Sequence, residues 1–170
     1  MPGSTTVKES DEVGSSMQLN DIFAPNAVIA ALPATSKTQV LRALAEAAAA
    51  ACSLDPLELF EVLREREQLG STAIGEGVAI PHVKVSGLER LVGWIARLEE
   101  PVDFDAIDDQ PVDLVVMLLA PESAGAEHLR VLGQLSRLAK DHRRCAILRG
   151  CSSADALWAA LTQQDELRAA

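Results

Sequence analysis

The chain has 170 residues, which suits one domain large enough to bury a hydrophobic core, and 48% of its residues are apolar. Aromatic residues make up only 3% and tyrosine is absent, so the core must be built mainly from Ala, Leu, Val and Ile. The formal net charge of −10 argues against nucleic acid or an anionic membrane surface as the main partner, because both attract basic surfaces.

The cysteines and the apolar runs indicate the compartment. Cys52, Cys145 and Cys151 are odd in number, and their spacing matches no zinc or redox motif, so we expect reduced thiols that pack as small core residues. No apolar run approaches the length of a membrane span, and residues 1–10 lack the apolar segment of a signal peptide. These features predict a soluble cytoplasmic protein without membrane insertion.

The N-terminal part is expected to be a tail followed by one domain. Residues 1–16 are polar and rich in Ser, Thr, Glu and Asp, which predicts a flexible tail. The domain is expected to span residues 17–168. Its first strand is predicted at 28–32, where an apolar run precedes a proline.

Two helices are predicted next, each with a recognisable start. Ser36 is placed to cap the first, with Gln39 three residues on to complete a capping box, and a run of alanines favours the helix that follows. Asp55 is placed to cap the second, with proline at its first position and Gly70 at its end. The second helix is expected to bury an apolar stripe of Leu57, Phe60 and Leu63.

The second half alternates between strands and helices. Further strands are predicted at 78–80, 92–98 and 113–120, and the last is apolar enough to be a central strand that is buried on both faces. Later helices are predicted at about 124–140, capped by Ser123 with leucines 129, 132, 135 and 138 inside, at 142–149, and from Ser152 onwards. This order predicts a single-domain α/β layered sandwich with a central mixed sheet flanked by helices.

Residues 66–82 organise the rest of the chain. They read Arg-Glu-Gln-Leu-Gly-Ser-Thr-Ala-Ile-Gly-Glu-Gly-Val-Ala-Ile-Pro-His. An arginine ends a charged helical segment, a loop with three glycines follows, and a short apolar strand leads to Pro81 and His82. Since proline cannot donate to a strand ladder, we expect the strand to end at Pro81 and to present His82 beside the loop.

This segment resembles the active-site segment of the IIA domains of the bacterial phosphoenolpyruvate:sugar phosphotransferase system, of the mannitol/fructose type. Within that type it is most similar to the nitrogen-regulatory IIA proteins. The resemblance continues through residues 104–115 and 127–129, and it covers roughly residues 20–165. It implies the same fold, a central mixed sheet flanked by helices. Val83 departs from the pattern, because a smaller residue is expected after the histidine.

The resemblance implies that His82 accepts a phosphoryl group from a phosphohistidine on an HPr-like carrier, which enzyme I and phosphoenolpyruvate supply. A neutral imidazole is a competent nucleophile near pH 7. We expect a backbone carbonyl to hold one ring nitrogen and to leave the other, Nε2, free to attack. The sequence itself leaves open which nitrogen is used.

Two further residues are implied at the site. His128 falls in the first turn of a predicted helix, where the helix dipole disfavours an imidazolium, so a neutral His128 can donate a hydrogen bond to a phosphoryl oxygen. Arg66 offers the planar fork that suits phosphate, and phosphoryl transfer needs positive charge beside the transferred group. The alternatives are a core histidine and a surface charge run, with Arg64 as the other arginine.

The loop itself can bind the transferred group. The hydroxyls of Ser71 and Thr72, together with backbone amides from Gly70 onwards, form a candidate phosphate cradle. The structural alternative, in which each hydroxyl only caps the turn, is equally consistent with the sequence. No metal or other cofactor is expected.

Four functions remain in competition. The favoured one is a regulatory phosphocarrier whose phosphorylation state controls partner proteins, and a sugar-specific IIA that passes phosphate to a separate IIB protein is the alternative. In both, a phosphohistidine transfers phosphate between proteins, rather than an enzyme acting on a free substrate. A hydrolase or metal enzyme using His82, His128 and Glu127 lacks the close ligand pairs of zinc sites. A pure interaction module would leave the histidines unused. The sequence names no regulatory target and gives no dimer signal.

Overall fold

The computed structural model describes residues 18–162, so the predicted tail at 1–16 and residues 163–168 of the predicted domain lie outside the described part. The elements follow in the order α1 (Leu19–Ile22), β1 (Val28–Leu32), α2 (Lys37–Cys52), α3 (Pro56–Leu69), β2 (Ala73–Gly75), β3 (Val78–Ala79), β4 (His82–Val85), β5 (Val92–Val102), β6 (Val112–Pro121), α4 (Ala126–Lys140), α5 (His142–Gly150) and α6 (Ala154–Thr162).

One mixed sheet forms the centre of the fold. Its strands lie in the order β1-β5-β6-β3-β2, and β4 also pairs with β6. Strand β6 runs antiparallel to β5 and parallel to both β3 and β4. All of its residues are buried except Asp113, which is half-buried, as expected for an apolar strand covered on both faces. The prediction of an α/β fold with a central mixed sheet is confirmed.

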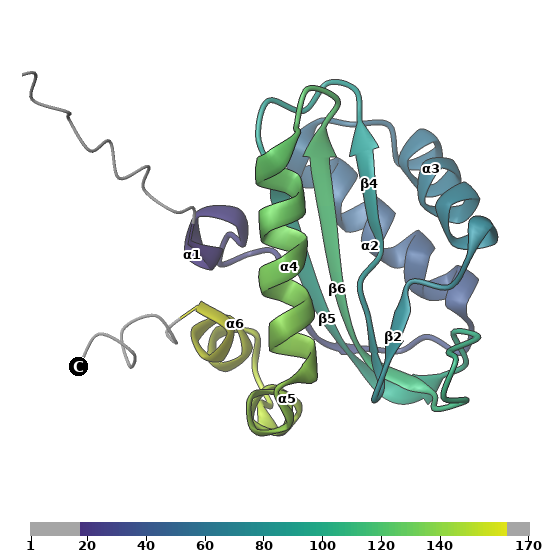
Figure 1. Cartoon of the computed structure of the whole chain (residues 1–170), viewed down its shortest axis with the longest axis vertical. Coiled ribbons are helices and arrows are strands. Elements are labelled where there is room, and N and C mark those ends of the chain that lie inside the picture. Colours follow the sequence, from purple (N-terminus) through teal and green to yellow (C-terminus); the bar gives the residue numbers. More distant parts are fainter. Residues whose placement is uncertain (1–17, 163–170) are drawn as a thin grey trace, which may run out of the picture.

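Helices cover both faces of the sheet, and each face has its own hydrophobic core. Helices α2 and α3 lie behind the sheet in Figure 1, and α4 lies in front with α1, α5 and α6 beside it. Because side chains alternate across a strand, β6 sends Val115, Met117 and Leu119 into the core with α2 and α3. It sends alternate residues, including Val116 and Leu118, into the core with α4 and α6.

The helix starts are mostly as predicted. The Ser36 hydroxyl accepts a hydrogen bond from the amide of Gln39, and the Asp55 carboxylate accepts from two amides at the start of α3. The predicted capping box is wrong in its second half, because the Gln39 side chain bonds Thr35 instead of returning to Ser36. Gly70 follows α3 as expected, but with an extended backbone (φ 161°), so its position does not require glycine.

Two predicted helix starts later in the chain were wrong. Helix α4 begins at Ala126 after Gly125, so Ser123 does not cap it. Helix α6 begins at Ala154, and the hydroxyl of Ser153 rather than Ser152 accepts from its first turn.

The expected apolar stripes were also wrong at one residue each. Leu57 is 69% exposed and Leu129 is 70% exposed, although both had been expected inside. Helix α3 instead buries Leu59, Phe60 and Leu63. The buried face of α3 is therefore rotated about the helix axis relative to the predicted stripe.

The cysteines are free thiols, and only Cys145 is fully buried, while Cys52 and Cys151 are half-buried. Among the described residues, no helix has both the length and the apolar character needed to cross a membrane.

Candidate active site

His82 lies at an interruption in a line of strand that runs along β6. Val78 and Ala79 pair with Leu114 and Val115 of β6, and the next paired residue is His82, opposite Leu118. The register offset is the same on both sides, so β3 and β4 form one line broken only at Ile80 and Pro81. Proline has no amide hydrogen to donate, which accounts for the break. His82 is thus the first residue of β4, not a residue beyond the end of a strand as predicted.

The interruption frees a carbonyl that holds the His82 ring. Nδ1 of His82 lies 2.8 Å from the carbonyl oxygen of Ile80. A carbonyl can only accept, so Nδ1 carries the proton and Nε2 carries a free lone pair. The side chain is half-buried, so one side of the ring remains accessible. A stiff strand therefore presents an imidazole in the tautomer in which Nε2 carries the free lone pair.

The fold brings His128 to the same place. The ring centroids of His82 and His128 lie 6.2 Å apart, with the ring planes tilted by 55°. His128 is the third residue of α4, and only 8% of its surface is exposed. Two histidines separated by 46 positions in the sequence thus form one pair at the sheet.

The surroundings of His128 favour the neutral form of its ring. Burial lowers its pKa, and positive charge on His82 and Lys84 lowers it further. The N-terminal end of α4 acts in the same direction. Within residues 18–162, its buried Nε2 has no hydrogen-bond partner. A neutral ring with one unused nitrogen, close to His82, is available to bond a group attached to His82.

We expect His128 to titrate below the ordinary histidine pKa of about 6.5. Since its pKa in the folded protein lies below that of the unfolded chain, protonation favours unfolding. The stability that His128 contributes is therefore complete above about pH 6.5 and is lost as the pH falls below it. The measurement is an NMR titration of its ring nitrogens, combined with urea unfolding of wild type and His128→Gln between about pH 5 and 8. A midpoint above the ordinary value, or parallel pH profiles for the two proteins, would contradict this.

The two candidate arginines have different surroundings. Arg66, in the last turn of α3, donates from Nη1 to the carbonyl oxygen of Gly70 at 3.0 Å. Its guanidinium therefore lies against the start of the glycine-rich loop. Arg64 instead pairs with Glu61 of the same helix at 2.6 Å. These contacts favour Arg66 over Arg64 as the cation of the site.

The two loop hydroxyls already have protein partners. Thr72 is buried, and its hydroxyl donates to the carboxylate of Glu67 at 2.6 Å. The hydroxyl of Ser71 donates to the carbonyl oxygen of Phe104 and accepts from the amide of Ala73. These bonds favour the structural role for both hydroxyls. The cradle formed with Gly70 and the backbone amides stays a prediction.

A second feature of the loop is the tight turn between β2 and β3. Gly75, Glu76 and Gly77 all have positive φ (94°, 58° and 80°), which glycine adopts without strain. The Glu76 amide donates to Asp108 at 2.8 Å, and the Glu76 carbonyl accepts from Arg149 at 2.8 Å. These contacts fix the hairpin that leads into β3.

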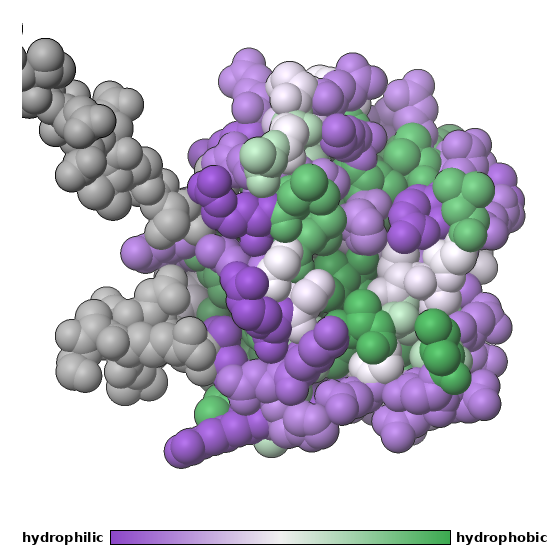
Figure 2. Space-filling view, viewed as in Figure 1, coloured by the Kyte–Doolittle hydropathy of each residue, from purple (hydrophilic) through white to green (hydrophobic). Residues whose placement is uncertain are grey.

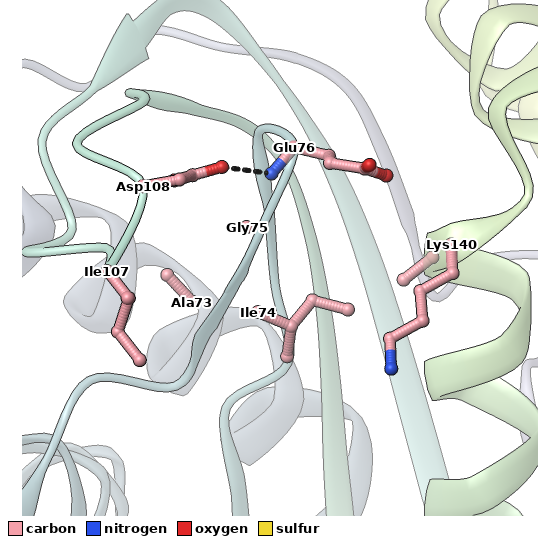
Figure 3. A pocket seen from close by; sticks show the side chains of 8 residues that line it. Ala73, Ile74, Gly75, Glu76, Ile107, Asp108 and Lys140 are labelled. Atoms are coloured by element: carbon pink, nitrogen blue, oxygen red, sulfur yellow. Dashed lines mark hydrogen bonds between the residues drawn. The ribbon is translucent and has the colours of Figure 1, made fainter.

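A cavity of about 470 Å³ lies beside this turn (Figure 3). Ile74, Ile107 and Lys140 line it together with the turn, and neither histidine of the pair does. No group of three or more His, Cys, Asp or Glu side chains in residues 18–162 is arranged to hold a metal ion.

Glu67 and Lys37 were missed by the sequence analysis. Glu67 is 6% exposed and binds both Thr72 and the ammonium of Lys37. In the sequence, Glu67 belongs to a mixed-charge run that is typical of a solvated helix face. The one available signal was its position between the arginine and the glycine-rich loop.

Comparison with known proteins gives consistent matches over most of the chain. Residues 21–164 match the family described as phosphoenolpyruvate-dependent sugar phosphotransferase system, EIIA 2. A nitrogen regulatory protein of Bradyrhizobium diazoefficiens is 47% identical over 145 residues, which cover 85% of this chain and 95% of that protein. The crystal structure of nitrogen regulatory protein IIA-Ntr from Neisseria meningitidis is similar with a TM-score of 0.80 at 36% identity, covering 85% of this chain and 99% of that one. The IIA mannitol structure from Escherichia coli shares the fold, with a TM-score of 0.68 at 24% identity over 82% of this chain and 97% of that one.

Proposed function

The chain belongs to the phosphoenolpyruvate-dependent sugar phosphotransferase system EIIA 2 family, and we propose that it is a regulatory phosphocarrier. It accepts a phosphoryl group on Nε2 of His82 from a phosphohistidine of an HPr-like carrier, which enzyme I and phosphoenolpyruvate supply. Its phosphorylation state then controls its binding to regulatory target proteins.

The observation that carries the proposal is the bond between Nδ1 of His82 and the Ile80 carbonyl. With the proton on Nδ1, the Nε2 lone pair attacks phosphorus while the bond from phosphorus to the donor imidazole breaks. One imidazole gains the phosphoryl group as the other loses it. The His82 proton stays on Nδ1, so the step needs no separate base.

The neighbours of His82 supply what the transferred group needs. A phosphoryl group in transfer carries negative charge on three oxygens, and catalysis consists of positioning and of stabilising that charge. The unpartnered Nε2 of His128 donates to one oxygen when it carries the proton of the neutral ring. The guanidinium of Arg66, beside the loop, supplies positive charge.

The surface around α4 suits a protein partner. Figure 2 shows apolar surface in the middle of this face, over the strands beside α4, with hydrophilic side chains around it. Exposed apolar residues include Leu129, next to the buried His128, and Ile107, which is 99% exposed. An apolar centre with a polar rim is typical of protein–protein contact, and it suits a donor that carries its phosphate on a folded protein.

The regulatory part of the proposal rests on the relatives named nitrogen regulatory proteins. Phosphorylation adds about −1.5 to −2 charges at pH 7. On a surface that docks a target, this change alters binding by repulsion or by new charged hydrogen bonds. A sugar-specific IIA that hands its phosphate to a separate IIB protein is the alternative, because the same site serves both.

The test compares two fates of the phosphorylated protein. The chain is phosphorylated with phosphoenolpyruvate, enzyme I and an HPr-like carrier, separated from them, and mixed with purified IIB proteins of its own organism. We expect the phosphoryl group to remain on the chain, and candidate regulatory targets to bind the phosphorylated and unphosphorylated forms with different affinities. Rapid stoichiometric transfer to one IIB protein would favour the sugar-specific function.

A further inference from the structure

Glu67 is a negatively charged residue at a helix position where the helix dipole disfavours negative charge. It lies in the last turn of α3, near the negative end of the helix dipole, and only 4% of its side chain is exposed. A buried carboxylate needs hydrogen bonds and a counter-charge to remain ionised. Such local conflicts tend to mark residues kept for a function.

The partners of Glu67 are all groups of the site loop or of one lysine. The amide of Thr72 donates to both carboxylate oxygens, at 3.1 and 3.3 Å, and its hydroxyl donates to one of them at 2.6 Å. The ammonium of Lys37 pairs with the same carboxylate at 3.3 Å. Glu67 thus binds both the backbone amide and the side-chain hydroxyl of Thr72.

Lys37 supplies the counter-charge. Besides Glu67, it pairs with Asp105 at 2.7 Å and approaches the Phe104 carbonyl that accepts from Ser71. Burial acts to lower its pKa, but the hydrogen bond that Lys37 donates to Asp105 and the charge of Glu67 outweigh burial and raise the pKa above the ordinary lysine value. Lys37 therefore stays charged and ties Glu67 to the loop around Phe104.

A chain of hydrogen bonds leads from Glu67 to the reactive ring. Glu67 holds Thr72, and the carbonyl oxygen of Thr72 accepts from the amide of Ile80 at 2.9 Å. The carbonyl oxygen of Ile80 accepts from Nδ1 of His82 at 2.8 Å. Pro81 follows and donates nothing, so the bond that the Ile80 amide donates to Thr72 anchors the strand break on one side, while the Pro81 carbonyl oxygen accepts from the amide of Leu118 at 2.9 Å on the other.

From this geometry we propose that Glu67, held by Lys37, is a positioning residue for His82. By fixing Thr72 it fixes the Ile80 carbonyl, which keeps the proton on Nδ1 and leaves Nε2 as the nucleophile. The structural part of this proposal is that Glu67 controls the tautomer of His82, and this part does not depend on the proposed function. The consequence for phosphoryl transfer rests on the proposed function.

The test measures the tautomer directly. Glu67→Ala removes the anchor, and Glu61→Ala is the matched control, because Glu61 is a carboxylate on the same helix whose partner is the exposed Arg64. The ring nitrogens of His82 are observed by 15N NMR in the unphosphorylated protein at about pH 8, where imidazole is neutral. We expect the proton to sit on Nδ1 in wild type and control, and Glu67→Ala to move towards the tautomer mixture of a free imidazole.

A second variant covers the case in which Glu67→Ala fails to fold. Thr72→Val removes only the hydroxyl bond to Glu67, and we expect a smaller shift in the same direction. Phosphorylation by the HPr-like carrier should slow roughly 10–100-fold in Glu67→Ala, as misplacement of a reacting group by about 1 Å does. Folded variants with an unchanged His82 tautomer would overturn the proposal.

The two proposals fail in different ways. The tautomer measurement uses no phosphoryl donor, so it is independent of the proposed function. If His82 is phosphorylated normally but no variant changes its tautomer, the positioning role of Glu67 is wrong and the function stands. If the tautomer shifts but His82 accepts no phosphate, the function is wrong and the positioning role stands.

Discussion

Replacing His82 with alanine is expected to abolish acceptance of the phosphoryl group. The substitution removes the one ring whose proton is fixed on Nδ1 and whose Nε2 is free. We do not expect His128 to replace it, because only 8% of that residue is exposed and its Nε2 is buried inside the protein. The measurement is the rate of mass gain after mixing with phosphoenolpyruvate, enzyme I and an HPr-like carrier.

The matched control for this prediction is His142→Ala. His142 is an exposed histidine whose Nε2 contacts Glu76 at 3.0 Å, and it belongs to α5 rather than to the pair. We expect this variant to be phosphorylated at the wild-type rate. If the His82→Ala protein still gains a phosphoryl group while folded, another residue is the acceptor and the proposed site is wrong.

Replacing Arg66 with alanine is expected to slow phosphorylation roughly 10²–10³-fold, which corresponds to a loss of about 2.7–4 kcal/mol of transition-state stabilisation. The physical reason is the loss of positive charge beside the oxygens of the transferred group. The Arg66 guanidinium also bonds the Gly70 carbonyl, so the variant loosens the start of the loop. Single-turnover transfer from the phosphorylated carrier separates the chemical step from carrier recycling.

Two further arginine variants make this result specific. Arg64→Ala, two positions before Arg66 and paired with Glu61, should react within about twofold of wild type, since exposed ion pairs contribute little. Arg66→Lys keeps the charge but loses the planar fork, so we expect an intermediate rate. A large loss in Arg64→Ala with a normal rate in Arg66→Ala would assign the role to Arg64.

The sequence predicted those features that local chemistry decides. Ser36 and Asp55 start their helices because a side-chain oxygen is placed to accept from nearby amides. The run at 113–120 became the central strand because only a position covered on both faces suits so many apolar residues. The segment from Arg66 to His82 pointed to the site through its glycines and the Pro-His pair.

Other features depend on contacts between distant parts of the chain. The strand that begins at His82 was missed because its four residues pair with β6, more than thirty positions away, and show no apolar run. The exposure of Leu57 and Leu129 was missed because helical spacing predicts an apolar stripe but does not show which edge of that stripe faces the sheet. The burial of Glu67 depends on its contact with Lys37, thirty positions earlier, and the only local signal was its position between Arg66 and the glycine-rich loop.

The most direct test of the account is to locate the phosphoryl group on the ring. Protein labelled with 15N is phosphorylated by phosphoenolpyruvate, enzyme I and an HPr-like carrier, and its histidine nitrogens are observed by NMR with coupling to phosphorus. We predict a single phosphoryl group on Nε2 of His82, with the proton still on Nδ1. A group on Nδ1 of His82, on His128, or on no histidine would contradict the central claim.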